Sequence, residues 1–198
     1  MLNGGVLFAW AVLAAGAATA SQPARPADAA AIIALTRETR ASYSLYLWNV
    51  VTLRGAPELR EWSAEFHMGH LHRVETPRDR VVADCAAMTG THLDLRSGER
   101  TSGAHVARAA CGIHANSRIL SAAVVGTSDS DRFGPVIHLE IVDPGAVRTY
   151  AVAANGALVG ATISDHSGHR DLAAEAVRLE SEVRADIFSR ASLDDSAV

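Results

Sequence analysis

The segment Arg60–Val74, REWSAEFHMGHLHRV, constrains the fold most, because its alternation of side-chain types predicts one long β-strand. The side chains of a strand point alternately to its two faces. One face would be largely apolar and carry two histidines: Trp62, Ala64, Phe66, Met68, His70, His72 and Val74. The opposite face, which includes Glu61, Glu65 and His67, would be mostly polar. Other strands of the chain are then needed to pair with this one.

Short apolar and β-branched runs, separated by turn residues, supply those strands. We predict them over residues 42–53, 81–86, 91–95, 136–142, 146–153 and 158–164. Asn155-Gly156 lies between the last two and is a dipeptide typical of tight hairpins. Residues 29–40 predict a short helix and residues 127–134 a loop. Residues 98–117 fit a helix as well as a strand, and the apolar run 119–125 is of undetermined type.

The C-terminal part of the chain has helical spacing. Apolar residues recur there at steps of three and four, namely Leu172, Ala176, Leu179, Val183 and Ile187. Such a stripe packs on a sheet or on a partner, and packing on the sheet is the commoner outcome. The fold class is therefore α+β: a curved antiparallel sheet or incomplete β-barrel of about seven or eight strands, with a short N-terminal and a long C-terminal helix. We expect a flexible tail over residues 191–198.

The N-terminus has the features of an export signal. An apolar stretch from Val6 to Ala15 precedes the small-x-small sequence Ala18-Thr19-Ala20, which predicts a signal peptide over residues 1–20 and cleavage before Ser21. The first residues lack Lys and Arg, so the alternative is an uncleaved membrane anchor. A linker over 21–28 and a single domain over 29–190 would follow. We expect a periplasmic or secreted protein that keeps no stable transmembrane segment after cleavage.

Cys85 and Cys111 are the only cysteines of the chain. Exported proteins meet an oxidising compartment, so an even count predicts a disulfide between them. The bond would close a loop of about 25 residues and stabilise the fold by about 3 kcal/mol in the chain-entropy model. Two free buried thiols or a redox pair are the alternatives, but the chain has no C-x-x-C motif and a structural bridge is favoured.

Composition excludes several classes of function. The 18 basic residues are all arginine, which rules out mechanisms that need a Schiff-base, phosphate-loop or general-base lysine. The formal net charge is -4 without a basic run, so nucleic acid is not expected as a partner. The sequence has no H-E-x-x-H motif, glycine-rich phosphate loop or nucleotide fingerprint, and we expect no cofactor. It identifies no protein partner.

Histidines gather in the long predicted strand as His67-x-x-His70-x-His72. Imidazole is the commonest metal ligand. On one strand, however, His70 and His72 share a face and His67 points away, unless a bulge at Gly69 re-aims the chain. A third ligand would have to come from another strand: His92, Asp94, His138 or Asp84. We therefore predict that His70 and His72 line the mouth of a pocket, and keep a metal site at these two residues as the alternative.

A second polar cluster, Asp165–Asp171, contains Asp, His and Ser, which are the residue types of a nucleophilic triad. Residues adjacent in sequence seldom have triad geometry, and the G-x-S-x-G elbow is missing. The cluster therefore predicts a polar turn.

The order of these segments resembles the Lol-type proteins, the periplasmic lipoprotein carriers and outer-membrane lipoprotein receptors. The resemblance lies in WSAEFHMGHLHRVETP (62–77), VVAD (81–84) and THLDL (91–95), and more loosely in YAVAANGALVGAT (150–162). It implies an incomplete antiparallel β-barrel whose helices cover an apolar cavity for acyl chains, and it places the family's cargo-binding arginine at Arg73. The chain departs from the family at Cys85, where the family has glycine, and in the Cys85–Cys111 loop.

Together these observations predict an exported, non-catalytic binding or carrier protein for an apolar ligand, such as an acyl chain, on the concave face of the sheet. The expected ligand-binding residues are Trp48, Trp62, Phe66, Met68, His70, His72 and Val74. One alternative is a metal-assisted periplasmic hydrolase that uses His70 and His72. The other is a cell-envelope interaction module that uses the C-terminal helix.

Overall fold

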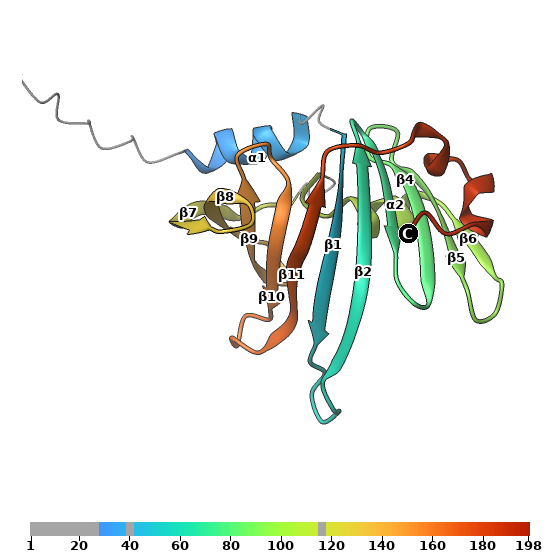
Figure 1. Ribbon diagram of the computed structural model, residues 1–198. Helices are drawn as coiled ribbons and strands as arrows, with labels where there is room; N and C mark the ends of the chain where they lie inside the picture. Colours follow the sequence, from blue (N-terminus) through green and yellow to red (C-terminus); the bar gives the residue numbers. More distant parts are fainter. Residues whose placement is uncertain (1–27, 39–41, 115–117) are drawn as a thin grey trace, which may run out of the picture.

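Backbone hydrogen bonds join eleven strands into one open, antiparallel sheet (Figure 1). The computed structural model describes residues 28–38, 42–114 and 118–198. In chain order the strands are β1 (Ser42–Val51), β2 (Leu59–Met68), β3 (Leu71–Glu75), β4 (Asp79–Asp84), β5 (Thr89–Asp94), β6 (Arg100–Ser102), β7 (Ser121–Ser130), β8 (Gly134–Val142), β9 (Val147–Ala153), β10 (Leu158–Ser164) and β11 (Arg170–Glu180). Their order across the sheet is β6-β5-β4-β3-β2-β1-β11-β10-β9-β8-β7.

Two meanders make up this sheet, because most strands pair with their neighbours in sequence. The first is β1–β6 and the second is β7–β11, and the pairing of β1 with β11 joins them. The described helices are short: α1 (Ala29–Glu38), α2 (Ala104–Cys111) and the 3-10 helices η1 (Gly112–His114), η2 (Ala185–Phe188) and η3 (Ala191–Asp194). The fold is thus a curved open sheet, as predicted, with more strands than expected.

The sheet has two differently covered faces. We call the face on which α1 and α2 pack the inner face, and the opposite one the outer face. On the inner face, α2 packs against β3, β4 and β5. Residues 181–198, which we call the C-terminal segment, lie on the outer face of the same strands. Figure 1 shows α2 behind these strands and the C-terminal segment in front of them.

Each face has its own buried core. On the inner face, Tyr43, Leu45 and Leu47 of β1 pack with Ala176 of β11, and Ile32 of α1 packs over β8 and β9. On the outer face, Ala64 and Phe66 of β2 pack against Ile187 of the C-terminal segment. Partly buried apolar side chains surround these three: Tyr46, Trp62, Val183 and Phe188. Both faces are therefore apolar, which explains the long apolar runs of the sequence.

The prediction of a single strand over Arg60–Val74 is wrong. The chain turns at Gly69-His70, where Gly69 has a φ of 62°, a left-handed conformation that glycine adopts without strain. Met68 pairs with Leu71 and His67 pairs with His72 across this tight hairpin. Because residues paired across an antiparallel ladder share a face, the turn brings His67 and His72 together.

The prediction of a long C-terminal helix is also wrong, and a β-bulge explains why. Residues 170–180 form β11, in which Ala176 pairs with Leu47 and Arg178 pairs with Tyr46, so that Val177 is an extra residue. The bulge shifts the alternation by one residue, and Leu172, Ala176 and Leu179 all face inward at spacings that mimic a helix. The interaction module built on that helix therefore loses its basis.

Other segments were predicted with mixed success. The ambiguous residues 98–117 contain both β6 and α2, and the predicted loop 127–134 is instead a hairpin between β7 and β8. The tail expected to be flexible is packed, since Leu193 is fully buried. The predicted signal peptide 1–20 and linker residues 21–27 lie outside the described residues. Among the helices that the structure describes, none is long and apolar enough to cross a membrane.

Candidate functional site

The hairpin at Gly69-His70 separates His70 from His72, which were predicted to share one face of a single strand. His70 lies in the turn, where 58% of its side chain is exposed and its Nε2 lies 3.5 Å from Oδ2 of Asp84. His72 is buried on the inner face. A metal site or a hydrolytic centre made of His70 and His72 therefore lacks the shared face on which it was predicted.

His72 instead belongs to a buried row of polar side chains at the junction of β1, β2 and β3. Its Nε2 lies 3.1 Å from Nδ1 of His67, and Nε2 of His67 lies 3.4 Å from Oε2 of Glu65. The ring of Tyr43 stacks on His67 with centroids 4.4 Å apart. Burial, aided by the charge of Glu65, raises the pKa of Tyr43, so its hydroxyl stays protonated. This row links the interior of the sheet to the side chain of Glu65.

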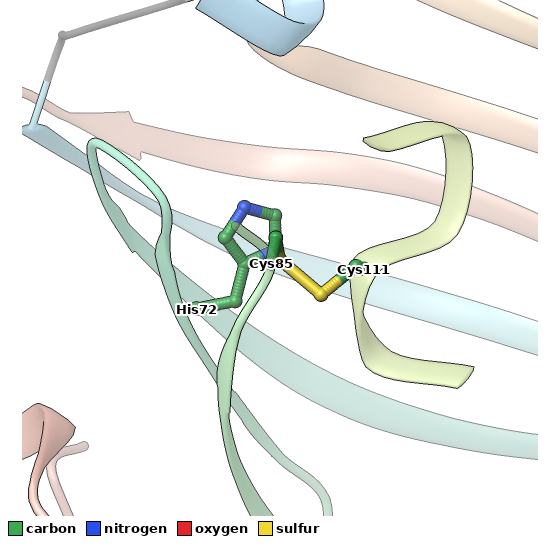
Figure 2. Close-up of side chains that lie close together, drawn as sticks. All are labelled: His72, Cys85 and Cys111. Carbon is green, nitrogen blue, oxygen red and sulfur yellow. A yellow bond between two sulfur atoms is a disulfide. The ribbon is translucent and has the colours of Figure 1, made fainter. Parts of the chain in front are cut away.

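The disulfide between Cys85 and Cys111 lies next to this row, as Figure 2 shows for His72. Cys85 follows β4 and Cys111 ends α2, so the bond that the cysteine count predicted ties α2 to the sheet. Within the described residues, His72, Cys85 and Cys111 are the side chains that come close enough to share an ion, with ligand atoms within 4.8 Å. Metal binding needs thiolates, however, and these sulfurs are bonded to each other.

A pocket of about 500 Å³ opens between α2 and the inner face of β2–β6. Its size falls within the range of about 300–1,000 Å³ that is typical of small-molecule sites. The sheet contributes Glu65, Val74, Thr76, Asp79, Val81, His92 and Thr101, and α2 contributes His105, Val106, Ala109 and Ala110. The walls thus combine five valine and alanine side chains with six polar ones, so the pocket offers both apolar surface and polar groups to a ligand.

The register of the strands explains how these residues meet. Val74 pairs with both Glu65 and Val81, and Val81 pairs with His92, which pairs with Thr101. A row of paired residues across a sheet points to one face. Across β4 and β5, Nε2 of His92 lies 2.7 Å from Oδ1 of Asp79. The pocket therefore has two carboxylates on its sheet side, those of Glu65 and Asp79.

Most of the residues predicted to bind the ligand lie elsewhere. Trp62 and Phe66 pack under the C-terminal segment on the outer face, and Trp48, which pairs with Trp62, is on the same face with 48% exposed. Met68 follows the same alternation outward. His70 lies in the turn and His72 beside the disulfide. Of the seven predicted residues, Val74 is the one that lines the pocket.

Arg73 is not available for cargo. Its side chain is completely buried on the outer face, where Nε donates to Oε1 of Glu75 at 2.7 Å. Its other nitrogens donate to carbonyl oxygens of the C-terminal segment, those of Ile187 at 2.7 Å and Ser192 at 3.0 Å among them. Glu75 in turn accepts from Ser196 Oγ and Ala197 N, both at 2.8 Å. This arginine therefore fixes the C-terminal segment to the sheet.

The cluster Asp165–Asp171 is a polar turn, as predicted, although it joins two strands rather than a strand and a helix. Oδ1 of Asp165 accepts hydrogen bonds from Ser167 Oγ at 2.6 Å, Ser167 N at 2.8 Å and His169 N at 3.0 Å. These bonds, together with one from Arg54, lower the pKa of Asp165 to about 2. Its side chains hold the turn and converge on no pocket residue.

Two sequence signals could have found the pocket. One is the pairing of His67 with His72 around Gly69, which puts Glu65 and Val74 on the same face. The other is the spacing of Val106, Ala109 and Ala110, which share one face of a helix that ends at Cys111. The first signal can be used only if the turn at Gly69 is known, and the second only if α2 is known to be a helix. The sequence decided neither.

Comparisons with known proteins show the fold alone. No protein-family model matches the sequence, and no curated protein matches it. An uncharacterized conserved protein from Thermus thermophilus has a similar structure, with a TM-score of 0.56 at 8% identity over 85% of this chain and 91% of that one. MucB matches at 0.49 and 13% identity over 85% of this chain, which spans 63% of MucB. A LolA superfamily protein from Nitrosomonas europaea matches at 0.43 and 10% identity over 83% and 99%.

A LolA superfamily protein, the class that the sequence resembles, is thus among the proteins of similar structure. At such identities a common fold does not imply a common activity. The function must therefore be argued from the pocket itself.

Proposed function

We propose that this protein is an exported binding or carrier protein that holds the apolar part of a small ligand in the pocket between α2 and β2–β6. The observation that carries the proposal is the pocket of about 500 Å³, whose lining includes three valines and two alanines, from both the sheet and α2. The ligand site thus lies on the inner face, and the aromatic residues of the outer face take no part in it.

The cover of the pocket supports a binding role. Burial of an apolar chain is favourable by roughly 25 cal/mol per Å² removed from water, and a helix over an open sheet removes both sides of a ligand from water. The disulfide anchors the C-terminal end of α2 to β4, so this cover keeps its place when the pocket is empty. Such preorganisation lowers the entropic cost of binding.

The disulfide also supports export, because such bonds persist in oxidising compartments. The proposed location is therefore the periplasm or the extracellular space.

Filling the pocket tests the proposal. The substitution Ala109→Trp adds an indole at an exposed alanine that lines the pocket, whereas Ala104→Trp changes an exposed alanine of the same helix that does not line it. We expect the neutral apolar dye phenylnaphthylamine to bind the wild-type protein and the Ala104→Trp variant, and to bind Ala109→Trp at least tenfold more weakly. Native mass spectrometry of the purified protein should also show a co-purified amphiphile. Equal dye affinity in all three proteins would refute the pocket as the binding site.

A further inference from the structure

With histidine counted as neutral, the charged side chains in the pocket lining are all acidic. Its two acidic side chains, Glu65 and Asp79, come from β2 and β4. None of the described residues that line the pocket is an arginine, although the chain has 18 basic residues. The remaining polar side chains are two threonines and the imidazoles of His92 and His105. A ligand therefore meets carboxylates and no guanidinium.

Both carboxylates keep acceptor capacity for a ligand. A carboxylate has about four lone-pair sites. Glu65 is 32% exposed and is in contact with one imidazole nitrogen, at 3.4 Å. Asp79 Oδ1 is 2.7 Å from His92, and its Oδ2 accepts from Thr76 Oγ1 at 3.3 Å. Neither group is saturated, and neither is paired with an arginine among the residues that the structure describes.

The surroundings strengthen this charge preference. Val74 and Val81 separate the two acidic residues along the paired strands, and Val106 lines the pocket from α2. In such a partly apolar setting a charge is less screened than in bulk water. An anionic head group entering here would lose its hydration and gain like-charge neighbours, whereas a cationic one would gain partners.

We infer that the pocket selects amphiphiles whose polar end is an ammonium group, with Glu65 as its partner and with the charge of Asp79 adding to the attraction. This inference rests on the proposed function, since it assigns a head group to the ligand of the same pocket. The apolar chain lies against the valine and alanine walls, and the ammonium donates to the free lone pairs of Glu65. A fatty acid carrying a carboxylate is selected against.

Calorimetric titration of the purified protein with ligands of equal chain length tests the inference. The ligands are dodecylamine, dodecanol and dodecanoate, each below its micelle concentration and at one ionic strength. We expect dodecylamine to bind about tenfold more tightly than dodecanol, and dodecanoate to bind most weakly, because a hydrogen bond to a charged group is worth about one to two factors of ten.

Variants assign the effect to the named residues. Glu65→Gln should lower the affinity for dodecylamine about tenfold and leave that for dodecanol within about twofold. Glu140→Gln makes the same change on β8, away from the pocket, and should alter neither. If Glu65→Gln fails to fold by circular dichroism, Asp79→Asn serves as the second variant, with a smaller loss in the same direction.

The outcomes separate the two proposals. If none of the three ligands binds, both the proposed function and this inference fail. If all bind but the amine has no advantage over the alcohol, or if Glu65→Gln weakens both equally, the inference fails and the apolar pocket stands.

The ammonium group comes either from a simple amine or from an ethanolamine lipid. A pair of single-chain phospholipids, with ethanolamine and glycerol head groups, distinguishes these sources. Preference for the ethanolamine lipid would identify a lipid ligand. Equal binding of the two lipids, together with preference for dodecylamine over dodecanol, would identify an amine.

Discussion

The inner and outer faces of β2–β5 are made by alternate residues of the same strands, yet they have opposite properties. On the outer face, Arg73 and Glu75 are almost fully buried and bonded to each other and to the C-terminal segment. On the inner face, Glu65 and Asp79 border an open volume and keep unused acceptor sites. Saturated polar groups under a packed segment stabilise a fold, whereas unsaturated ones beside a cavity are available to a ligand. The outer face is thus the structural one.

The largest expected effect is on the outer face. Arg73→Met leaves Glu75 buried without its main partner and should cost about 3–5 kcal/mol in the free energy of unfolding. Arg78→Met is the matched control, because Arg78 pairs with Glu61 at the surface with 60% of its side chain exposed. That pair should contribute less than about 1 kcal/mol. Denaturant titration measures both, and equal losses would contradict the role of Arg73 in fixing the C-terminal segment.

The same Arg73→Met variant tests whether a change on the outer face alters ligand binding on the inner face. At a temperature at which it remains folded, its affinity for phenylnaphthylamine should equal that of the wild type, because the pocket is on the other face. A large loss of dye binding by the folded variant would show that the faces are coupled.

Removal of the disulfide should affect both stability and binding. The double substitution Cys85→Ser with Cys111→Ser opens a loop spanning 26 residues and should destabilise the fold by about 3 kcal/mol. Because α2 loses its anchor, dye affinity should also fall severalfold. Reduction of the wild-type protein with a dithiol is the independent check. Reduced stability with unchanged dye binding would mean that α2 keeps its place without the bond.

The packing of α2 on β5 gives a smaller effect on the inner face alone. A Cβ at Gly90 would lie 2.9 Å from the backbone nitrogen of Ala107, so Gly90→Ala must displace the helix. The expected cost is about 1–3 kcal/mol, with weaker dye binding. Gly126→Ala on β7 is the control, because its Cβ would meet no atom closer than 4.0 Å. Thermal melts and dye titrations of the two variants should differ, and matching results would refute the close contact.

The smallest effect is expected at the turn around Asp165, which belongs to neither covered face. Its pKa of about 2 lies below the unfolded value of about 3.9, so its charge stabilises the fold above about pH 4, and this contribution is lost as the pH falls to about 2. Asp165→Asn should therefore melt slightly below the wild type at neutral pH and converge with it near pH 2. Asp171→Asn, which alters an exposed carboxylate of the same hairpin, is the matched control.

Sequence patterns predicted elements well where the signal is local. The strand 158–164 and the helix beginning at Ala29 are found as expected, and the hairpin at Asn155-Gly156 joins β9 to β10. These features depend on propensities and turn types of a few adjacent residues. The prediction of a helix was wrong for residues 170–180, because one bulge gave this strand the apolar spacing of a helix.

The sequence by itself determined that the chain forms an antiparallel sheet with apolar faces and that Cys85 can bond to Cys111. Only the tertiary structure decided which face each residue takes, because the turn at Gly69 and the bulge at Val177 each shift the alternation of side chains. A shift of one residue moves every following side chain to the opposite face. That is why Trp62 and Phe66 became core under the C-terminal segment, while Glu65 and Val74 came to line a pocket.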